Sequence, residues 1–189
     1  MTTTIRHYAA KGFTLIELLI VVIIIAILAA IAIPQFSNTS GDAQESAALA
    51  NLTTMRSAIE LYRVQHNGRY PSKAPPTGST APATCPANGA GSTTDNDATT
   101  FTDQLTKYSS LSGHTCSTAA AGYSFGPYIR AIPSEPITGS NEVVVATTAA
   151  ATPTPGDDTV GWRFVNDTGT LQINSSNLAR DGTTELSAK

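Results

Sequence analysis

The feature that most constrains this 189-residue chain is a run of sixteen consecutive apolar residues at 18–33. Counted from Phe13, the segment has 21 residues, and as an α-helix it is about 30 Å long. That length matches the hydrocarbon core of a bilayer. Residues 1–12 carry Arg6 and Lys11 and no acid. Because excess positive charge holds such a leader in the cytoplasm, the rest of the chain is predicted to lie outside the inner membrane.

One charged residue, Glu17, lies at the head of this apolar segment. A charge inside lipid costs about 3 kcal/mol or more, so such residues usually have a partner. No basic residue lies between Phe13 and Met55, and we therefore expect no partner within the segment itself. If the chain were cut after Gly12, the new α-amine of Phe13 would be a cation at membrane depth. That amine could pair with Glu17 of a neighbouring copy.

Three interpretations fit a basic leader followed by an apolar run. The first is a plain N-terminal membrane anchor. The second is a secretory signal cleaved at the small residues Ala30-Ile31-Ala32. Against it, the run is slightly long for the apolar region of a signal peptide, and an acid stands at its head. The third is cleavage directly after Gly12, with the apolar segment kept in the mature protein.

The third interpretation rests on a resemblance carried by about 25 residues. The string Gly12-Phe-Thr-Leu-Ile-Glu-Leu-Leu-Ile-Val-Val, and then Ala-Ile-Leu-Ala-Ala-Ile-Ala-Ile-Pro-Gln-Phe36, resembles the N-terminus of bacterial type IV pilins and type II secretion pseudopilins. In that family a membrane peptidase cuts after the glycine and methylates the new N-terminal residue. The resemblance implies that Gly12 is the cleavage site, Phe13 the methylated residue and Glu17 the acid that guides subunit docking. Pro34, which lacks a backbone N–H, is predicted to break the helix.

The resemblance also implies an architecture and a set of partners. We expect an α+β, type IV pilin-like fold, in which a long N-terminal helical stalk packs on a small antiparallel β-sheet head. The predicted segments are a cleaved leader at 1–12, a membrane and filament-core helix at 13–36, an amphipathic lower stalk at 37–67 and the head at 68–189. The expected partners are copies of the chain, the prepilin peptidase, the inner membrane and its assembly platform.

The implied function is that of a structural subunit of a type IV pilus, a filament used for adhesion, motility or DNA uptake. The alternative is a pseudopilin of a type II secretion system. Before assembly the subunit would lie in the inner membrane with its head outside the cytoplasm. Afterwards it would belong to an extracellular pilus or, in the alternative, to a periplasmic pseudopilus.

Residues 43–67 are predicted to form an amphipathic helix that stops at Asn67-Gly68. Its apolar positions recur at spacings of 3, 3, 4 and 3, which is one face of a helix: Leu49, Leu52, Met55, Ile59 and Tyr62. Its charged positions are expected on the other side: Arg56, Glu60 and Arg63. The string Asn67-Gly-Arg-Tyr-Pro71 resembles one found in the major pseudopilin and in many type IV pilins. Tyr70 is predicted to be a packing residue where the chain turns back.

The rest of the head is predicted to be a long Ser/Thr-rich loop with one short helix, followed by a small antiparallel sheet. The helix is indicated by Phe101, Leu105, Tyr108 and Leu111. Strands are predicted within 123–132, 142–147, 160–165 and 170–174, and the last two flank a hairpin turn at 166–169. The phrase at 126–136 resembles the stretch that leads into the calcium loop of G-type pseudopilins. The resemblance fails at 134–139, so we carry over no calcium ligands.

Two cysteines, Cys85 and Cys116, are predicted to form a disulfide in an oxidising compartment. The alternatives are two free buried thiols or, with less support, a metal site, since neither has a second ligand at close spacing. The full chain has a net charge of −3, and without the leader nine basic residues oppose 14 acidic ones. An acidic subunit argues against nucleic-acid binding. No catalytic residue, metal site or cofactor is expected, since no nucleophile has an evident base partner.

Overall fold

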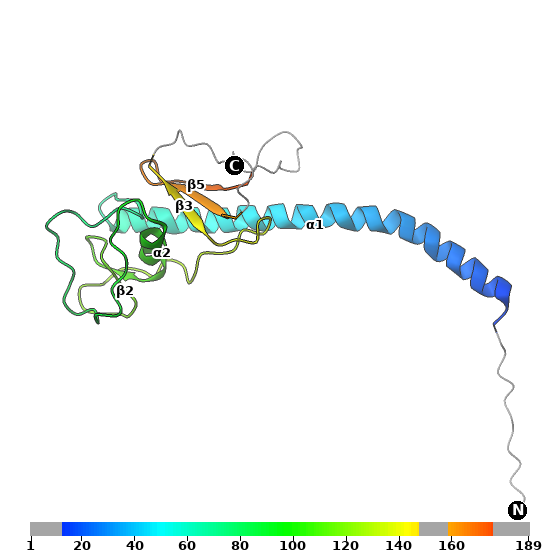
Figure 1. Cartoon of the computed structure of the whole chain (residues 1–189), viewed down its shortest axis with the longest axis horizontal. Helices are drawn as coiled ribbons and strands as arrows, with labels where there is room; N and C mark the ends of the chain where they lie inside the picture. Colours follow the sequence, from blue (N-terminus) through cyan, green and yellow to red (C-terminus); the bar gives the residue numbers. More distant parts are fainter. Residues whose placement is uncertain (1–12, 148–158, 176–189) are drawn as a thin grey trace, which may run out of the picture. The chain divides into compact units, whose positions relative to one another are not determined.

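The structure is a computed structural model that describes residues 13–147 and 159–175, without the side chains of residues 32–40. The chain divides into two compact units, Met1–Gly41 and Asp42–Lys189. A long helix, α1, belongs to both units, and the other elements belong to the second (Figure 1). In chain order these are α1 (Leu15–Gln65), α2 (Ala98–Thr106), β1 (Tyr108–Ser109), β2 (Thr115–Cys116), β3 (Val143–Ala146), β4 (Trp162–Val165) and β5 (Thr170–Ile173).

Helix α1 passes through Pro34 and Gly41 without interruption. The prediction that Pro34 breaks the helix is therefore wrong. A proline in a helix removes one hydrogen bond and crowds the preceding turn, but the turns on either side keep their own bonds. A single missing N–H bends or loosens a helix more readily than it ends one.

The second unit is organised by the predicted apolar face of α1. Four of the five predicted residues are fully buried and the first, Leu49, is half-buried. The helix ends at Gln65, where Asn67 and Gly68 take up left-handed backbone angles (φ 55° and 80°). The Gly68 N–H then donates to the Arg63 carbonyl at 2.8 Å, which satisfies an acceptor that the helix end leaves free. The Asn67-Gly68 stop is thus confirmed.

Three strands form the principal sheet, in the order β3-β4-β5. Strands β4 and β5 pair antiparallel around the predicted hairpin turn, with Trp162 opposite Ile173. Strand β3, however, pairs parallel to β4, with Val143 opposite Trp162, so the predicted antiparallel pairing holds for β4 and β5 but not for β3. A parallel pair needs a crossover of about a dozen residues or more. The connection between β3 and β4, residues 147–161, is long enough to supply it.

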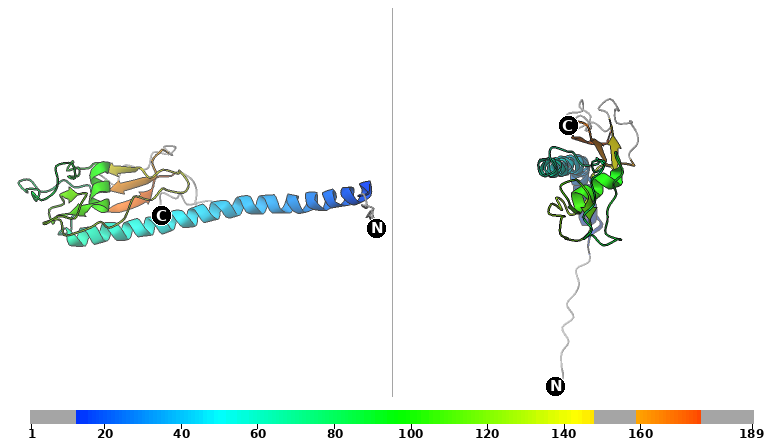
Figure 2. Two further views of the ribbon diagram at one scale, coloured as in Figure 1. Left: turned by 90° about the horizontal axis from the view of Figure 1, so that it is seen from below. Right: turned by 90° about the vertical axis from the view of Figure 1, so that its left-hand side faces the viewer.

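The core of the second unit lies between α1, α2 and the sheet, which Figure 2 shows side by side. The Trp162 side chain is fully buried, and its indole N–H donates to the Pro133 carbonyl at 2.8 Å. The rings of Phe101 on α2 and Phe164 on β4 lie 4.7 Å apart. The predicted short helix is confirmed by α2, although only Phe101 and Leu105 of its predicted residues lie within it.

The predicted strand within 123–132 is absent from this described stretch. Phe125 makes only an isolated bridge to Ser109, and the chain then passes through Gly126-Pro127. Since proline cannot donate to a ladder, a strand does not extend through it. The two-residue strands β1 and β2 pair antiparallel instead, an arrangement that the sequence did not predict.

Candidate assembly site

The N-terminal part of α1 exposes its large apolar side chains. Phe13 is 82% exposed, and every Leu, Ile and Val from Leu15 to Ile31 is also exposed in the single chain. A monomeric soluble protein rarely shows an apolar patch of this extent, which marks a surface for a membrane or for another protein. Among the described residues, no helix combines the length and the hydropathy that a membrane span requires.

Glu17 has a partner within its own segment, contrary to our expectation. The Thr14 backbone N–H and hydroxyl both donate to Oε2 of Glu17, at 2.9 and 2.7 Å. The Glu17 N–H approaches the Thr14 hydroxyl at 3.3 Å in return. This reciprocal pair is a capping box, which satisfies backbone donors at the first turn of a helix. The spacing Thr-x-x-Glu was readable in the sequence, so the role of Thr14 was missed rather than hidden.

The structure describes some of the other predicted N-terminal residues and not others. Gly12 lies outside the described residues, and Phe13 directly precedes the cap residue Thr14. Pro34 lies within α1, where its side chain is outside the description. Cleavage after Gly12 and methylation of Phe13 therefore stay predictions. What the structure adds is the exposure of Phe13 and the cap that holds Glu17.

The string Asn67-Gly-Arg-Tyr-Pro71 forms a structural junction between α1 and the β4–β5 hairpin. The Tyr70 ring packs against the core, and the Arg63 guanidinium lies 4.9 Å from its centre. A methyl group at Gly169, in the hairpin turn (φ 74°), would lie 2.0 Å from the Tyr70 ring. Tyr70 is thus a packing residue, as expected, and the turn needs a glycine both for its backbone angle and for this contact.

His66 directly follows the last residue of α1 and lies in the interior of the second unit. It is fully buried and stacks on Tyr62, with ring centres 3.8 Å apart. Its Nδ1 lies 2.8 Å from the Tyr62 carbonyl, and its Nε2 has no hydrogen-bond partner. Burial lowers the pKa of His66, because desolvation disfavours the charged ring, and the nearby Arg69 acts in the same direction. The geometry is that of a neutral core histidine.

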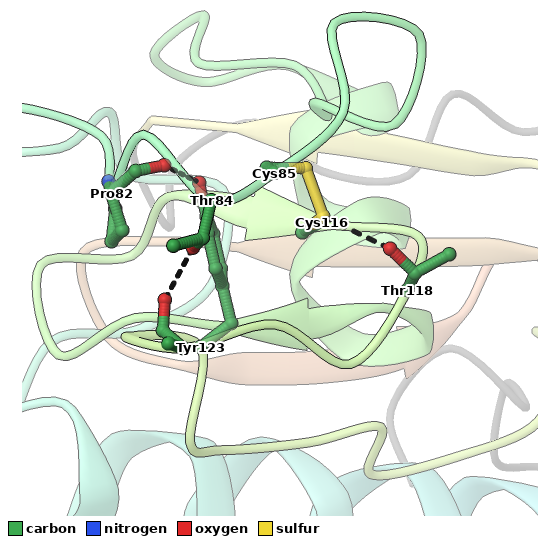
Figure 3. The surroundings of a disulfide bond; sticks show 7 residues. Pro82, Thr84, Cys85, Cys116, Thr118 and Tyr123 are labelled. Carbon is green, nitrogen blue, oxygen red and sulfur yellow. Dashed lines mark hydrogen bonds between the residues drawn. A yellow bond between two sulfur atoms is a disulfide. The ribbon is translucent and has the colours of Figure 1, made fainter.

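Cys85 and Cys116 are joined in the structure, with Cα atoms 5.8 Å apart (Figure 3). The bond fastens the long loop to β2, and other contacts lie around it. Tyr123 is buried and donates its hydroxyl to the Pro82 carbonyl at 3.3 Å. The Thr84 hydroxyl donates to the carbonyl of Ala121. The loop is therefore held both covalently and by hydrogen bonds.

The stretch where the pseudopilin resemblance failed forms a self-contained turn. Glu135 is fully buried, and its carboxylate accepts from the N–H groups of Ile137 at 3.0 Å and Thr138 at 2.6 Å. Its oxygens are thus directed to the backbone of their own loop. Among the described residues, no three potential ligands gather as a metal site. Asp157 and Asp158 are acidic neighbours in the sequence, a pattern more typical of a solvated turn than of a metal site, and they lie outside the described residues.

Comparison with known proteins finds similarity in the same N-terminal segment. The model of the prokaryotic N-terminal methylation motif matches residues 8–33. The type IV major fimbrial protein of Dichelobacter nodosus is 60% identical over 50 residues, 26% of this chain and 32% of that protein. The type IV narrow pilus major component of Thermus thermophilus is 48% identical over 59 residues, 31% of this chain and 51% of that protein.

A relative from the other branch is also similar. The type II secretion system core protein G of Pectobacterium carotovorum is 32% identical over 65 residues, 34% of this chain and 41% of that protein. These three matches span from about a third to about half of the relatives' lengths. No solved structure matches the chain.

The residues that match this motif lead into helix α1, which continues into an α+β unit. The N-terminal segment of the chain is thus similar to those of type IV fimbrial proteins and of a type II secretion core protein G.

Proposed function

We propose that this chain is a structural subunit of a type IV pilus and polymerises through the N-terminal part of α1. The observation that carries the proposal is the exposed apolar surface at 13–31, which lies within the matched methylation motif at 8–33. Burying that surface among copies removes it from water, at roughly 25 cal/mol for each Å². Before assembly, the same surface would be buried in the lipid of the inner membrane, after the prepilin peptidase has cut behind Gly12.

In this proposal Glu17 has two tasks that act through different oxygens. Oε2 receives both hydrogen bonds from Thr14. Oε1 accepts no hydrogen bond from any residue that the structure describes, and so it can bind the α-amine of Phe13 on an incoming copy. The negative charge also lies at the N-terminus of α1, where the helix dipole favours it. Docking then neutralises a carboxylate that would otherwise enter the filament core unpaired.

The second candidate is a pseudopilin that acts in protein export. It is supported by the similarity to core protein G and by the Asn-Gly-Arg-Tyr-Pro junction at 67–71. Against it stand the higher identity to fimbrial subunits and the Glu135 turn, which replaces the string expected in G-type pseudopilins. The pilus is therefore the preferred branch.

The proposal is tested on filaments sheared from cells that express the native chain. We expect this chain to dominate them, with an intact mass that begins at a methylated Phe13. Deleting the gene should remove surface fibres and leave enzyme secretion intact. Fibres that persist while secretion stops would reverse the choice of branch, and a mature start after Ala32 would contradict the motif.

A single substitution separates the charge of Glu17 from its cap. In Glu17→Gln the amide oxygen still accepts from Thr14, but the negative charge is gone. We expect membrane insertion and the start of α1 to be retained, with filament yield reduced at least about ten-fold, since an interfacial charge pair is worth about 1.5 kcal/mol or more. Thr14→Ser, which keeps the hydroxyl, is the matched control. Normal yield from Glu17→Gln would refute the pairing.

A further inference from the structure

The two edges of the β3-β4-β5 sheet differ in how their backbone groups are satisfied. At the β5 edge, the Leu171 carbonyl accepts two hydrogen bonds from the Arg56 guanidinium on α1. At the β3 edge, no strand that the structure describes pairs with β3 on the side away from β4. An unpaired strand edge is a template on which a further chain can add as a strand. The β3 edge is therefore a candidate surface for a ligand.

The ladder between β3 and β4 shows which backbone groups of β3 are free. The Trp162 N–H donates to the Glu142 carbonyl at 3.0 Å, so that carbonyl points toward β4. Successive residues of a strand direct their hydrogen-bonding groups to opposite sides. The N–H and C=O groups of Val143 and Val145 therefore point away from β4. None of these groups makes a backbone hydrogen bond to a residue that the structure describes.

A groove of about 550 Å³ lies between α2 and the start of β3, and we call it the β3 groove. Its volume falls within the range of about 300–1,000 Å³ that is typical of ligand sites. Residues 130–132 and 141–143 form two of its walls, and Val143 brings it to the free edge of β3. The α2 wall carries three threonines on one face of the helix: Thr99, Thr102 and Thr106. A groove between a helix and an unpaired strand suits an extended peptide.

Arg130 and Glu142, which both line the β3 groove, are exposed side chains of opposite charge. Neither makes an ion pair or a side-chain hydrogen bond with any residue in the described part of the chain. A guanidinium binds a carboxylate through two parallel hydrogen bonds, and a carboxylate in turn binds an ammonium group. Two opposite, unpaired charges in one groove complement a ligand that carries both signs, and they disfavour a ligand that carries only one.

We propose that the β3 groove binds an extended peptide segment of another protein, which adds as a strand along β3 and carries both an acidic and a basic side chain. The peptide backbone pairs with the free groups of Val143 and Val145. Its acid lies at Arg130 and its base at Glu142. The inference goes beyond the proposed function, because no residue of α1 lines the groove and no step of the argument requires a filament.

The first test measures the binding of a capped, fluorescent peptide, Thr-Lys-Val-Thr-Val-Glu-Thr, to the detergent-solubilised full chain. Its charged residues lie on one side of an extended strand and its valines on the other. Two companion peptides carry either two lysines or two glutamates at the charged positions. We expect fluorescence polarisation at low ionic strength to show that the native chain binds the mixed peptide at least about ten-fold more tightly than either companion.

Two single variants should change this preference in opposite directions. In Arg130→Glu both charges of the groove are negative, so the dilysine peptide should bind best. In Glu142→Arg both are positive, so the diglutamate peptide should bind best. Both side chains are exposed, and we expect the native fold to be retained. Arg63→Glu, on α1 and outside the groove, changes the net charge by the same amount as Arg130→Glu and should keep the native preference.

A third measurement separates strand addition from attraction between charges alone. The mixed peptide is made with N-methyl groups on alternate residues, in each of the two possible phases. An added strand directs the N–H groups of every second residue toward β3, where a methyl group blocks pairing. One phase should therefore lose at least about ten-fold in affinity, and the other should stay within about three-fold of the unmethylated peptide.

Several outcomes would overturn the inference. They are failure of the mixed peptide to bind, equal binding of the three peptides, and equal effects of the two methylated phases. A shift of preference in Arg63→Glu would also overturn it, because that shift would reflect net charge. Binding that disappears when the subunits form filaments would assign the groove to a neighbouring copy instead of another protein. A chain that binds the mixed peptide but forms no filaments would refute the proposed function and leave this inference in place.

Discussion

Ile24 and Ile59 are the same residue type in the same helix, yet Ile24 is 51% exposed and Ile59 is 1% exposed. Both stretches are helical, so the difference does not come from the local backbone. The difference comes from whether other elements of the chain pack over each side chain. The second unit covers Ile59 with its own α2 and sheet, whereas the described part of the first unit leaves Ile24 uncovered. One stretch of α1 is completed by folding and the other is left to other molecules.

The largest expected effect tests this difference directly. Ile59→Ala should lower the free energy of unfolding of the second unit by about 2–5 kcal/mol, because it leaves a cavity in a packed core. Ile24→Ala should change it by less than about 0.5 kcal/mol. Urea unfolding of the detergent-solubilised subunit, followed by the fluorescence of Trp162, the chain's single tryptophan, measures both. Equal losses for the two variants would break the comparison.

The disulfide should stabilise the second unit by a comparable or smaller amount. Its sequence separation of 31 residues corresponds to about 3–4 kcal/mol in the chain-entropy model. We expect the double variant Cys85→Ser, Cys116→Ser to lose about this much in the same urea experiment, with the helical content of the first unit unchanged. The native chain under reducing conditions is the control. Two alkylatable thiols in freshly purified, non-reduced filaments would contradict the bond.

The smallest effect concerns pH and lies within the second unit. Burial lowers the pKa of His66 below its ordinary value of about 6.5. Between the lowered pKa of the folded state and this ordinary value, the unfolded chain binds a proton that the folded chain does not. The stability contributed by neutral His66 is therefore complete above about pH 6.5 and declines as the pH falls, by up to about 1.4 kcal/mol per pH unit.

A matched pair of variants isolates this residue. His66→Phe should flatten the decline in stability on acidification, while His114→Gln, which changes the histidine in the β1–β2 connection, should leave it in place. Urea midpoints measured at several pH values between 7 and 5 provide the test. An unchanged slope in His66→Phe would show that other groups govern the acid sensitivity of the second unit.

Sequence patterns correctly predicted the structural features that depend on residues close together in the chain. The face formed by Leu52, Met55 and Ile59 follows from helical spacing, and the β4–β5 hairpin follows from the turn that contains Gly169. The helix end at Asn67-Gly68 also depends only on local backbone preference. Each of these was correct because the relevant interaction spans a few residues.

Features that depend on distant residues were missed. The sequence placed Arg56 on the solvent side of α1, but its guanidinium donates two hydrogen bonds to the Leu171 carbonyl on β5, at 2.8 and 3.1 Å. A long arginine side chain reaches around the helix, and residue spacing does not reveal that. The parallel β3–β4 pair likewise joins strands that a connection of many residues separates in the sequence. The Thr14–Glu17 pair is an exception, because it is a local feature that the Thr-x-x-Glu spacing is enough to predict.

The Thr14–Glu17 cap bears on what maturation does to the chain. Helix α1 begins at Leu15, and its first turn is fixed by side chains that lie after the predicted cleavage position. A cut behind Gly12 therefore unwinds nothing and exposes no new backbone group of the helix. It would change only the charge at this end of the chain, because it would place an amine next to the N-terminus of a helix. The helix dipole already repels positive charge there. Cleavage would then change the charge of a helix end that is already formed, and the carboxylate of a neighbouring copy would neutralise the new amine.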